Sequence, residues 1–495
     1  MKILVANRGE IAVRILRACR EMGLPSVAVY SAADEQALHT RYADEAVPVG
    51  PAEASQSYLN IPAVIEAARK SGAGAVHPGY GFLSENAEFA RAVEEAGLIF
   101  IGPRPETLAL TGDKLAARKA AREAGLPVLP GPDRPLEEDL RWSTIPDSIR
   151  FPVLIKAIAG GGGRGIRLAN TRGELEQMVS LARREAKAAF GDDAVYLEPL
   201  VQNARHIEVQ ILGAGRGCVV CLGERECSIQ RRRQKLIEEA PSPGLPASLR
   251  QRLYDTAERL ADHLDYRSLG TIEFLLDPRG DFHFIEVNPR IQVEHGVTEM
   301  VTGLDLVRAQ IALAVEGTLL YSQADVQPRG WSIEARILAE DPEAGFLPAT
   351  GTVTHLQAPG GIGVRVDSAL YAGMPVTADY DSLLAKIIAW GETRPVALDR
   401  LRRALREFQL GGLPTDLEFL LQVIESEAFA DGGVDTTFLD RFEPPGREDE
   451  EALGWEIALA SALKAHQDQK PAAAAGSGPA NEWQQAAWRE QMGMR

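Results

Sequence analysis

Residues 286–295 read Glu-Val-Asn-Pro-Arg-Ile-Gln-Val-Glu-His, and this stretch decides most of what the sequence predicts. Glu286 and Asn288 are two positions apart, so on a strand their side chains lie on one face. Arg290 and Glu294 follow where that strand is expected to end. This combination suits phosphoryl transfer onto an acidic oxygen nucleophile. Oxygen ligands hold a metal that screens phosphate charge, the guanidinium holds an anion, and the second glutamate removes a proton.

The segment upstream predicts a hairpin that adds a third ligand. Residues 271–287 read as strand, turn and strand, with Asp277-Pro278-Arg279-Gly280 as the turn. With those four residues as the loop, Glu273 lies opposite Phe284 and diagonal to Glu286 on the same face. A register slip of one residue would destroy this arrangement. No His or Cys accompanies the carboxylates and the amide, so the set favours Mg²⁺ or Mn²⁺ over zinc. The alternative is an exposed acidic face on a surface hairpin.

Length and composition limit the class of protein. The chain has 495 residues, of which 45% are hydrophobic and 25% charged, and its net charge is −17. This length predicts about three domains. The negative charge argues against nucleic acid or an anionic membrane as the main partner. The first residues enter a strand directly, with no signal peptide, and no apolar run spans a bilayer, so the cytosol is the expected location.

One cysteine motif is assigned to the core. Cys218 and Cys221 form a C-x-x-C inside Cys-Val-Val-Cys-Leu, which reads as a buried strand. Positions i and i+3 of a strand point to opposite faces, and no second pair or nearby His completes a zinc site. Both are therefore predicted to be core thiols.

The pattern of elements predicts an α/β and α+β chain of several units. Residues 1–111 alternate strand and helix, with one helix predicted at 61–71. This indicates a parallel, Rossmann-like sheet covered on both faces, although the first turn lacks the G-x-G-x-x-G of NAD-binding folds. Residues 112–330 form the central domain, with a small lid at about 131–202, and residues 331–445 form a C-terminal α/β unit. Residues 446–495 read as a linker and a tail.

The lid carries a glycine loop. The strand at 151–156 leads to Gly-Gly-Gly-Gly-Arg-Gly at 160–165, and a strand at 166–168 follows. Glycines let the backbone approach a phosphate chain, and Lys156 and Arg164 favour phosphate contact. A flexible hairpin tip is the alternative.

Two further segments carry polar groups whose role the pattern leaves open. The strand at 195–198 ends in Glu198, which suits a ribose or adenine edge. His206, Glu208 and Gln210 share one face of a strand, and that face is either functional or solvated.

A cationic run follows. Residues 231–235 hold four cations in five positions, which indicates a local anion site or a surface strip that Glu238 and Glu239 neutralise.

These motifs together resemble biotin carboxylase, the ATP-grasp component of biotin-dependent carboxylases such as acyl-CoA carboxylase of fatty acid biosynthesis. The resemblance covers residues 1 to about 445. Besides the glycine loop, its blocks are Ala6–Ala12, His77–Asn86, Gly112–Lys114, Arg205–Gln210, Glu286–His295 and Tyr380–Ser382.

The resemblance implies an ATP-grasp ligase that carboxylates biotin with bicarbonate through carboxyphosphate, using ATP and Mg²⁺ or Mn²⁺. Glu294 resembles the base that deprotonates bicarbonate, and Arg290 and Arg336 resemble the guanidinium groups that hold anions and the biotin enolate. The implied ATP contacts are Lys114, Lys156, Gly161, Gly162, Gly163, Gly165, Glu198, His206, Gln230, Glu273 and Glu286. The implied bicarbonate contacts are Lys235, Arg290, Gln292 and Val293, the biotin contact is Arg336, and the metal ligands are Glu273, Glu286 and Asn288.

Three departures from the family pattern matter. Arg233 stands where the family usually has His, which puts nucleotide affinity there in question. Gly296 replaces the usual Pro or Thr and is expected to loosen the turn that holds Glu294. Ile362 replaces an aromatic near the dimer contact, which weakens the expectation of a homodimer.

Two absences define the expected partners. The chain has no Met-Lys-Met biotinylation motif and no carboxyltransferase segment, so biotin is expected on a separate biotin carboxyl carrier protein, with a carboxyltransferase subunit as second partner. The transferase selects the final acceptor, such as acetyl-CoA, propionyl-CoA or pyruvate. Trp483–Trp488 in the tail is either a docking segment or a remnant. Two alternative hypotheses are an ATP-grasp ligase that joins a carboxylate to an amine, and a nucleotide-gated subunit without catalysis.

Overall fold

The computed structural model describes residues 1–131, 134–136, 151–158 and 166–444. It has two compact units, Met1–Phe442 and Glu443–Arg495, and all elements given below belong to the first. The glycine loop, with Gly161, Gly162, Gly163 and Gly165, and the tail at 446–495 lie outside the described residues. No helix in the described part of the chain has the length and apolar character needed to span a membrane.

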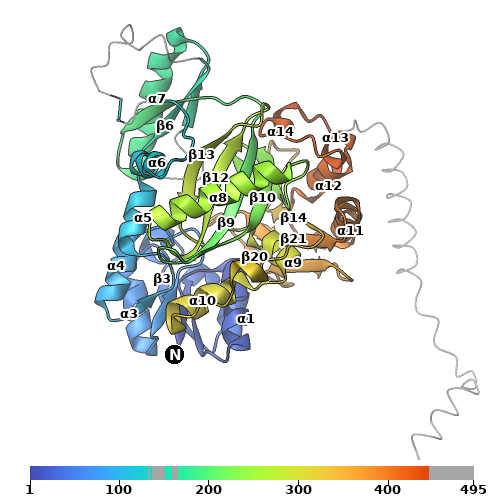
Figure 1. Cartoon of the computed structure of the whole chain (residues 1–495). Coiled ribbons are helices and arrows are strands. Elements are labelled where there is room, and N and C mark those ends of the chain that lie inside the picture. The colour runs from blue at the N-terminus through green and yellow to red at the C-terminus, as the bar shows by residue number, and fades with distance from the viewer. Residues whose placement is uncertain (132–133, 137–150, 159–165, 445–495) are drawn as a thin grey trace, which may run out of the picture. The chain divides into compact units, whose positions relative to one another are not determined.

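The N-terminal part forms the parallel sheet that the alternating pattern predicts, with strand order β3-β2-β1-β4-β5 (Figure 1). Its strands are β1 (Ile3–Val5), β2 (Ser26–Ser31), β3 (Glu45–Gly50), β4 (Ala75–His77) and β5 (Ile99–Phe100). Its helices are α1 (Gly9–Glu21), α2 (Leu38–Tyr42), α3 (Ile61–Ser71), α4 (Ala87–Glu95) and α5 (Pro105–Gly112). The central strand β1 is entirely buried, as expected for a strand covered on both faces.

Local signals fix the ends of α3. The side chain of Asn60 accepts a hydrogen bond from the amide of Ala63, so it caps the first turn. Gly72 ends the helix in the left-handed region, with φ of 66°. These two signals explain why the predicted helix at 61–71 coincides with the observed one.

A small antiparallel sheet, with strand order β7-β6-β8, corresponds to the predicted lid. Helix α6 (Lys114–Glu123) precedes this unit, which contains β6 (Val153–Ala157), β7 (Ile166–Ala169), α7 (Arg172–Phe190) and β8 (Val195–Pro199). Leu175 and Val179 of α7 pack on Val153 and Ile155 of β6, so the unit has its own core.

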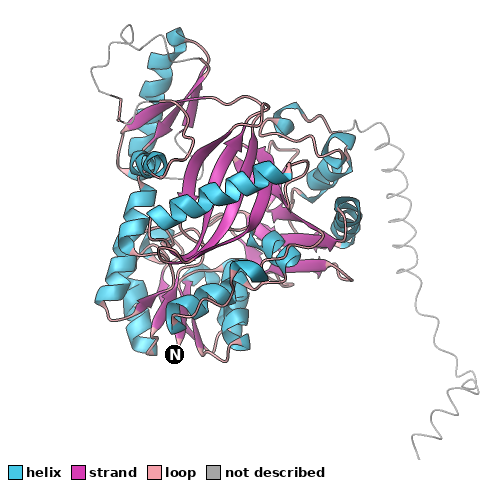
Figure 2. Cartoon of the chain, viewed as in Figure 1, coloured by secondary structure: helices cyan, strands magenta, loops and turns pink. Residues whose placement is uncertain are grey.

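The largest sheet is antiparallel and has the strand order β13-β12-β9-β10-β11-β14-β21-β19. Its central-domain elements are β9 (Arg205–Ala214), β10 (Val219–Arg231), β11 (Gln234–Ala240), α8 (Ala247–His263), β12 (Arg267–Leu276), β13 (Phe282–Asn288), α9 (His295–Thr302) and α10 (Leu306–Glu316). Helix α8 lies across one face of the sheet (Figure 2), where Leu253 and Leu260 are buried with Val209 and Phe274.

The same sheet continues into the C-terminal part. Strand β11 pairs with β14 (Trp331–Leu338), so the sheet crosses the boundary that the sequence indicated near residue 330. The other C-terminal elements are β15 (Glu340–Asp341), β16 (Leu347–Pro348), β17 (Gly351–Thr352), β18 (His355–Gln357), β19 (Val364–Ser368), β20 (Pro375–Val376), β21 (Leu383–Gly391), α11 (Arg394–Glu407), β22 (Gln409–Gly411), α12 (Leu417–Glu425), α13 (Glu427–Ala430) and α14 (Phe438–Arg441).

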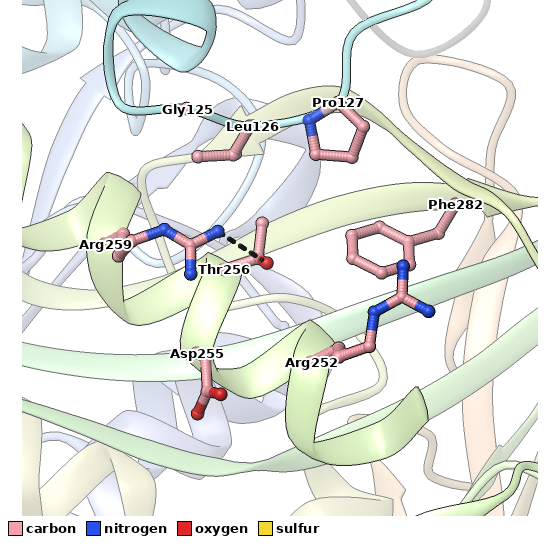
Figure 3. Close-up of a pocket in the computed structure, with 8 residues that line it drawn as sticks. All are labelled: Gly125, Leu126, Pro127, Arg252, Asp255, Thr256, Arg259 and Phe282. Carbon is pink, nitrogen blue, oxygen red and sulfur yellow. Dashed lines mark hydrogen bonds between the residues drawn. The ribbon is translucent and has the colours of Figure 1, made fainter. Parts of the chain in front are cut away.

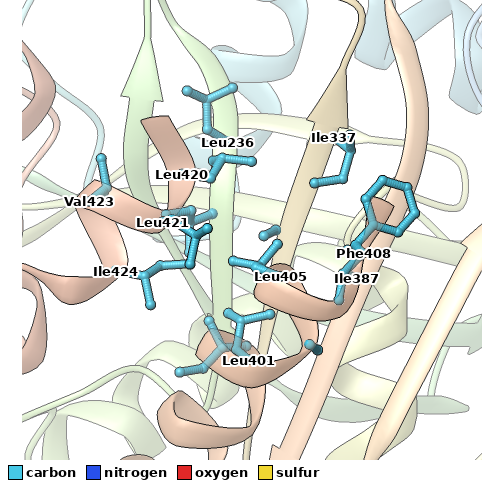
Figure 4. Packing of buried hydrophobic residues seen from close by; sticks show 14 of the residues in the cluster. Leu236, Ile337, Ile387, Leu401, Leu405, Phe408, Leu420, Leu421, Val423 and Ile424 are labelled. Carbon is cyan, nitrogen blue, oxygen red and sulfur yellow. The ribbon is translucent and has the colours of Figure 1, made fainter. Parts of the chain in front are cut away.

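Helices α11 and α12 cover this end of the sheet with leucine-rich faces. Leu401 and Leu405 of α11 and Leu420 and Ile424 of α12 are entirely buried in a cluster with Ile337 (Figure 4). Their spacing of three or four positions is the one that forms an apolar helix face. This core holds β14 and β21 rigidly, and both strands carry side chains of the site described below.

The predicted register of the β12–β13 hairpin is wrong by one residue, but the predicted face is right. A four-residue loop would pair Leu276 with Asp281, whereas Leu276 pairs with Phe282. A β-bulge between Glu273 and Phe274 then shifts the register, so Glu273 lies directly opposite Glu286. The bulge adds one residue to one strand and therefore restores the shared face.

The two cysteines of the C-x-x-C motif do not share one environment. Cys221 lies buried in β10, as predicted, but Cys218 is exposed in the turn before that strand. The prediction of a core thiol is therefore wrong for Cys218, because the strand begins one residue after it.

Candidate active site

The polar face of β9 is buried, so it is not the solvated surface that the alternating pattern allowed. His206 is 8% exposed, and Glu208 and Gln210 are fully buried. Glu273 on β12 pairs directly with Glu208, so the two strands carry acidic groups side by side. Buried carboxylates need compensating charge, and Lys235 on β11 supplies it.

Lys235 joins three carboxylates from three elements. Its Nζ lies 2.6 Å from Glu208, 2.9 Å from Glu273 and 2.6 Å from Glu294. Burial alone would lower the pKa of the lysine, but these carboxylates outweigh it and hold the pKa well above its ordinary value. Lys235 is therefore a permanent cation at the centre of the site.

Glu294 lies between two cations. One oxygen accepts from Lys235 at 2.6 Å, and the other from Arg336 on β14 at 2.9 Å. Burial would raise the pKa of Glu294, but Lys235, Arg336 and Arg225 outweigh it and hold the pKa well below its usual range. The carboxylate is thus ionised, which is the form of a glutamate that can accept a proton.

The three predicted metal ligands lie together. Glu273 faces Glu286 across the hairpin, and the amide of Asn288 donates to Glu273 at 2.9 Å. Burial, followed by the charge of Glu273, raises the pKa of Glu286. Two opposed carboxylates with an amide oxygen beside them fit Mg²⁺ or Mn²⁺, because a divalent cation would relieve their repulsion.

The expectation that no His accompanies this set is wrong. Nε2 of His206 lies 2.9 Å from an oxygen of Glu273, and Cys227 lies close to Glu208 and Glu294. The sequence separation of β9 and β10 from the hairpin hid this proximity, since only sheet pairing brings the strands together. The facing carboxylates still favour a hard cation over zinc.

The segment after β13 forms a turn that carries an anion-binding candidate. Arg290 donates to Glu85 at 2.5 Å and to Asn288 at 3.1 Å. The amide of Gln292 donates to Glu273 at 3.0 Å, and the carbonyl of Val293 accepts from Lys386 at 2.7 Å. The structure thus brings all four predicted bicarbonate contacts to one region around Lys235 and Glu294.

The predicted nucleotide contacts of the lid lie beside each other. Lys156 on β6 forms an ion pair with Glu198 on β8, and Arg118 also donates to Glu198 at 2.9 Å. Lys114 donates to the carbonyl of Ala157 at 3.3 Å, and burial lowers its pKa although Glu286 raises it. Both oxygens of Glu198 are therefore engaged by cations.

Gln230 joins the other side of this region. Its amide lies 2.8 Å from Nδ1 of His206 and also donates to the carbonyl of Cys227. This contact fixes the ring whose other nitrogen faces Glu273.

Sequence reasoning missed Arg225 as part of the site. It is fully buried on β10 and donates to Glu208 at 2.5 Å, Gln210 at 2.7 Å and Gln292 at 3.0 Å. The signal was its position within Glu224-Arg225-Glu226, a charged triplet in a strand whose earlier residues are apolar. Where such a triplet continues a buried apolar strand, its charges need partners on both faces of the strand.

The cationic run at 231–235 does not act as one patch. Arg231 forms an ion pair with Glu340, whereas Lys235 turns into the site. The expectation that Glu238 and Glu239 neutralise the run is wrong. Glu238 lies 2.5 Å from Arg336 on the neighbouring strand β14. Glu239 lies 2.7 Å from Arg394 at the start of helix α11.

The three residues that differ from the family pattern lie in different environments. Arg233 has φ of 67° in the tight turn after β10 and donates to the carbonyl of Ile166 at 3.4 Å. At Gly296, a Cβ atom would lie 2.3 Å from Cδ1 of Ile388, so the glycine makes room for close packing. The expected loosening of the turn that holds Glu294 stays a prediction. Ile362 is 82% exposed.

A groove outside the site is lined by the segment 125–127 that follows α6, by α8 and by β13 (Figure 3). Arg259 donates to Thr256 within it, and Arg252 lies over the ring of Phe282. None of the predicted site residues lines this groove, so it is not the reaction site.

A small three-stranded lid sheet, two facing carboxylates and a central lysine are features of an ATP-grasp enzyme, and three sequence profiles agree with this class. "Biotin carboxylase, N-terminal domain" matches residues 1–108, "Carbamoyl-phosphate synthase L chain, ATP binding domain" matches 113–321, and "Biotin carboxylase C-terminal domain" matches 334–441. The chain belongs to the biotin carboxylase family.

Individual relatives agree. The chain is 50% identical to the chloroplastic biotin carboxylase of Arabidopsis thaliana over 91% of this chain and 84% of that protein. It is 49% identical to biotin carboxylase of Pseudomonas aeruginosa over 89% of this chain and 98% of that one.

A solved structure extends the likeness to three dimensions. The biotin carboxylase domain dimer of Hydrogenobacter thermophilus 2-oxoglutarate carboxylase, in complex with MgADP, ADP and bicarbonate, matches with a TM-score of 0.86 and 45% identity. The match covers 89% of this chain and 97% of that one. The prediction of the family and of its fold is thus confirmed.

Proposed function

We propose that this enzyme carboxylates biotin with bicarbonate at the expense of ATP, and that Glu294 is its base. The observation that carries the proposal is the position of Glu294 between Lys235 and Arg336, beside the Glu273–Glu286–Asn288 face. This arrangement offers an ionised proton acceptor within a ring of cations that attracts an anionic substrate.

The residues have distinct roles in this scheme. Lys235 and Arg290 hold bicarbonate, and Glu294 removes its proton. The resulting oxygen attacks the γ-phosphate of ATP, which gives ADP and carboxyphosphate. Carboxyphosphate then breaks down to CO₂ and phosphate, and this phosphate takes the ureido proton of biotin. Arg336 stabilises the resulting enolate oxygen while the ureido nitrogen attacks CO₂ and forms carboxybiotin. Lys114 and Lys156 neutralise the nucleotide phosphates, because both are close to the metal face and the lid.

Glu273, Glu286 and Asn288 would hold Mg²⁺ or Mn²⁺. When bound, the ion would screen the charge of the ATP phosphates. The protein's part is to keep the two carboxylates opposed. For Glu273, Lys235 and His206 also hold the pKa well below its usual range against the effect of burial.

The proposal includes the expected assembly. Biotin is on a separate carboxyl carrier protein, a carboxyltransferase subunit uses the product, and the chain forms a homodimer in the cytosol. The carboxyltransferase selects the final acceptor, with acyl-CoA and pyruvate among the candidates. The domain division of 1–111, 112–330 and 331–445 stays part of the proposal, and the profile limits at 108–113 and 321–334 support it.

The test is ADP release with ATP, Mg²⁺ and bicarbonate, with and without free biotin or a biotinylated carrier. We expect ATP cleavage that requires bicarbonate and is stimulated by biotin. If the protein binds ATP but does not cleave it in a bicarbonate-dependent way, even with the carrier, the proposal is refuted and a subunit without catalysis is favoured. Stimulation by amines instead would favour a different ATP-grasp ligase.

A further inference from the structure

Two buried side chains hold consecutive carbonyl groups of the turn that precedes Glu294. Nδ1 of His295 lies 2.7 Å from the carbonyl oxygen of Gln292, and Nζ of Lys386 donates to the carbonyl oxygen of Val293 at 2.7 Å. Both His295 and Lys386 are fully buried. Neither is among the residues that the reaction scheme uses, and they come from α9 and β21.

A held carbonyl fixes the amide that follows it. The peptide unit is planar and trans, so its C=O and N–H point in opposite directions. The bond from His295 to the carbonyl of Gln292 therefore turns the N–H of Val293 away from the core. The bond from Lys386 does the same for the N–H of Glu294. Among the described residues, neither N–H donates a hydrogen bond.

The two N–H groups lie in the segment that joins the anion-binding candidates. Arg290 precedes them, and Gln292 reaches Glu273 from the same turn. Adjacent N–H groups without protein acceptors form an anion-binding concavity. A small oxyanion beside Glu294 would accept hydrogen bonds from both N–H groups. If the two carbonyl groups were not held, the peptide units could reorient and the N–H groups would no longer converge.

Lys386 is itself held by carboxylates from two other parts of the chain. Its Nζ lies 3.3 Å from Glu10 on α1 and 3.7 Å from Asp367 on β19. Tyr80 donates to Glu10, and Arg365 donates to both oxygens of Asp367. Burial would lower the pKa of Lys386, but Glu10, Glu334 and Asp367 outweigh it and raise the pKa, so the lysine stays charged.

His295 acts as a neutral donor. Burial lowers its pKa to about 3, and the contact with a carbonyl oxygen requires the proton on Nδ1. A neutral ring suits this role, since it holds the carbonyl of Gln292 without adding positive charge to the site.

We propose that Lys386 and His295 are positioning residues for the bicarbonate step: they hold the carbonyls of Val293 and Gln292 so that the amides of Glu294 and Val293 face the bound anion. This inference rests on the proposed function. It links α1, β19 and β21 to the turn through Lys386, and it assigns no contact between these two side chains and the substrate.

The test separates bicarbonate binding from nucleotide binding. Lys386→Met removes the charge and keeps the length, and Lys386→Arg keeps a cationic donor. We expect K386M to raise the KM for bicarbonate about tenfold or more, as loss of a charge-assisted bond at a binding turn implies. We expect its KM for ATP to change less than about twofold, and K386R to restore much of the loss.

Arg394→Met is the matched control. It also removes a largely buried cation from an ion pair, here with Glu239, but it does not contact the turn. A K386M variant whose KM for bicarbonate rises no more than that of R394M, or whose KM for ATP rises equally, overturns the inference.

A second variant keeps the inference testable where K386M does not fold, which circular dichroism would report. His295→Leu removes the donor to Gln292 and must show the same selective rise in the KM for bicarbonate. An unchanged KM in H295L overturns the inference. Failure of the proposed function looks different, because the wild-type protein would then show no bicarbonate-dependent ATP cleavage.

Discussion

Glu294→Gln is the most direct perturbation of the site, because it removes one charge and no volume. The carboxylate accepts from Lys235 at 2.6 Å and from Arg336 at 2.9 Å. A glutamine keeps one oxygen for one of these cations and turns an NH₂ group toward the other. Lys235 keeps Glu208 and Glu273, and Arg336 keeps Glu238, so the loss of one bond to a charged group should lower folding stability by about 1.5–3 kcal/mol.

The effect on rate has a separate origin. A general base in the transition state contributes about 10²–10⁴-fold, and a neutral amide cannot accept the proton of bicarbonate. We therefore expect biotin-stimulated ADP release to fall about 100-fold or more, with ATP binding kept within a few-fold. Coupled spectrophotometry measures the rate, and urea unfolding measures the stability.

Glu239→Gln is the matched control for this variant. Glu239 is also a buried glutamate that accepts hydrogen bonds from an arginine and from a second donor, Arg394 at 2.7 Å and Trp331 at 2.7 Å, but it contacts no group of the site. We expect a similar loss of stability and a nearly unchanged rate. An E294Q enzyme that keeps more than about a tenth of the wild-type rate would refute the assignment of the base, as would an equal loss in E239Q.

Three further predictions follow from packing, protonation and metal binding. Gly296→Ala should cost about 1–3 kcal/mol of stability through overpacking on Cδ1 of Ile388. Adding Ile388→Val should restore part of this stability, as measured by urea unfolding. A double variant whose loss of stability equals the sum of the two single losses would contradict the prediction. The folded pKa of Glu299 is about 2 against 4.5 unfolded, so its ionisation stabilises the fold above pH 4.5 and that stability is lost as pH falls toward 2. Glu299→Gln should thus cost about 3 kcal/mol at pH 7 and little near pH 2, and a pH-independent cost would rule this out. Glu286→Gln should raise the Mg²⁺ concentration for half-maximal ATP cleavage at least about tenfold without changing the KM for bicarbonate; an unchanged Mg²⁺ titration would remove Glu286 from the metal set.

Much of the local structure followed from the sequence. Helix α3 has the predicted ends because Asn60 and Gly72 provide a cap and a stop within the chain. The strand–loop–strand of the lid and the 271–287 hairpin were also predictable, since turn residues and alternation are local signals.

The hairpin also shows where local reasoning fails. The predicted register of β12 and β13 was off by one, and only a bulge returned Glu273 to the face of Glu286. Bulges depend on how a strand fits its neighbours on both sides, here β9 and β13 around β12, and alternation within one strand does not report them.

The sequence by itself determined the family and the fold class, and it supplied the candidate residues of 286–295, because a short motif specifies side-chain types and spacing. The tertiary structure decided which charges neutralise which. Lys235 meets Glu208, Glu273 and Glu294, and Glu238 turns to Arg336 instead of the cationic run. The physical reason is that ion pairs act over a few ångströms in space, and the pairing of distant strands sets those distances.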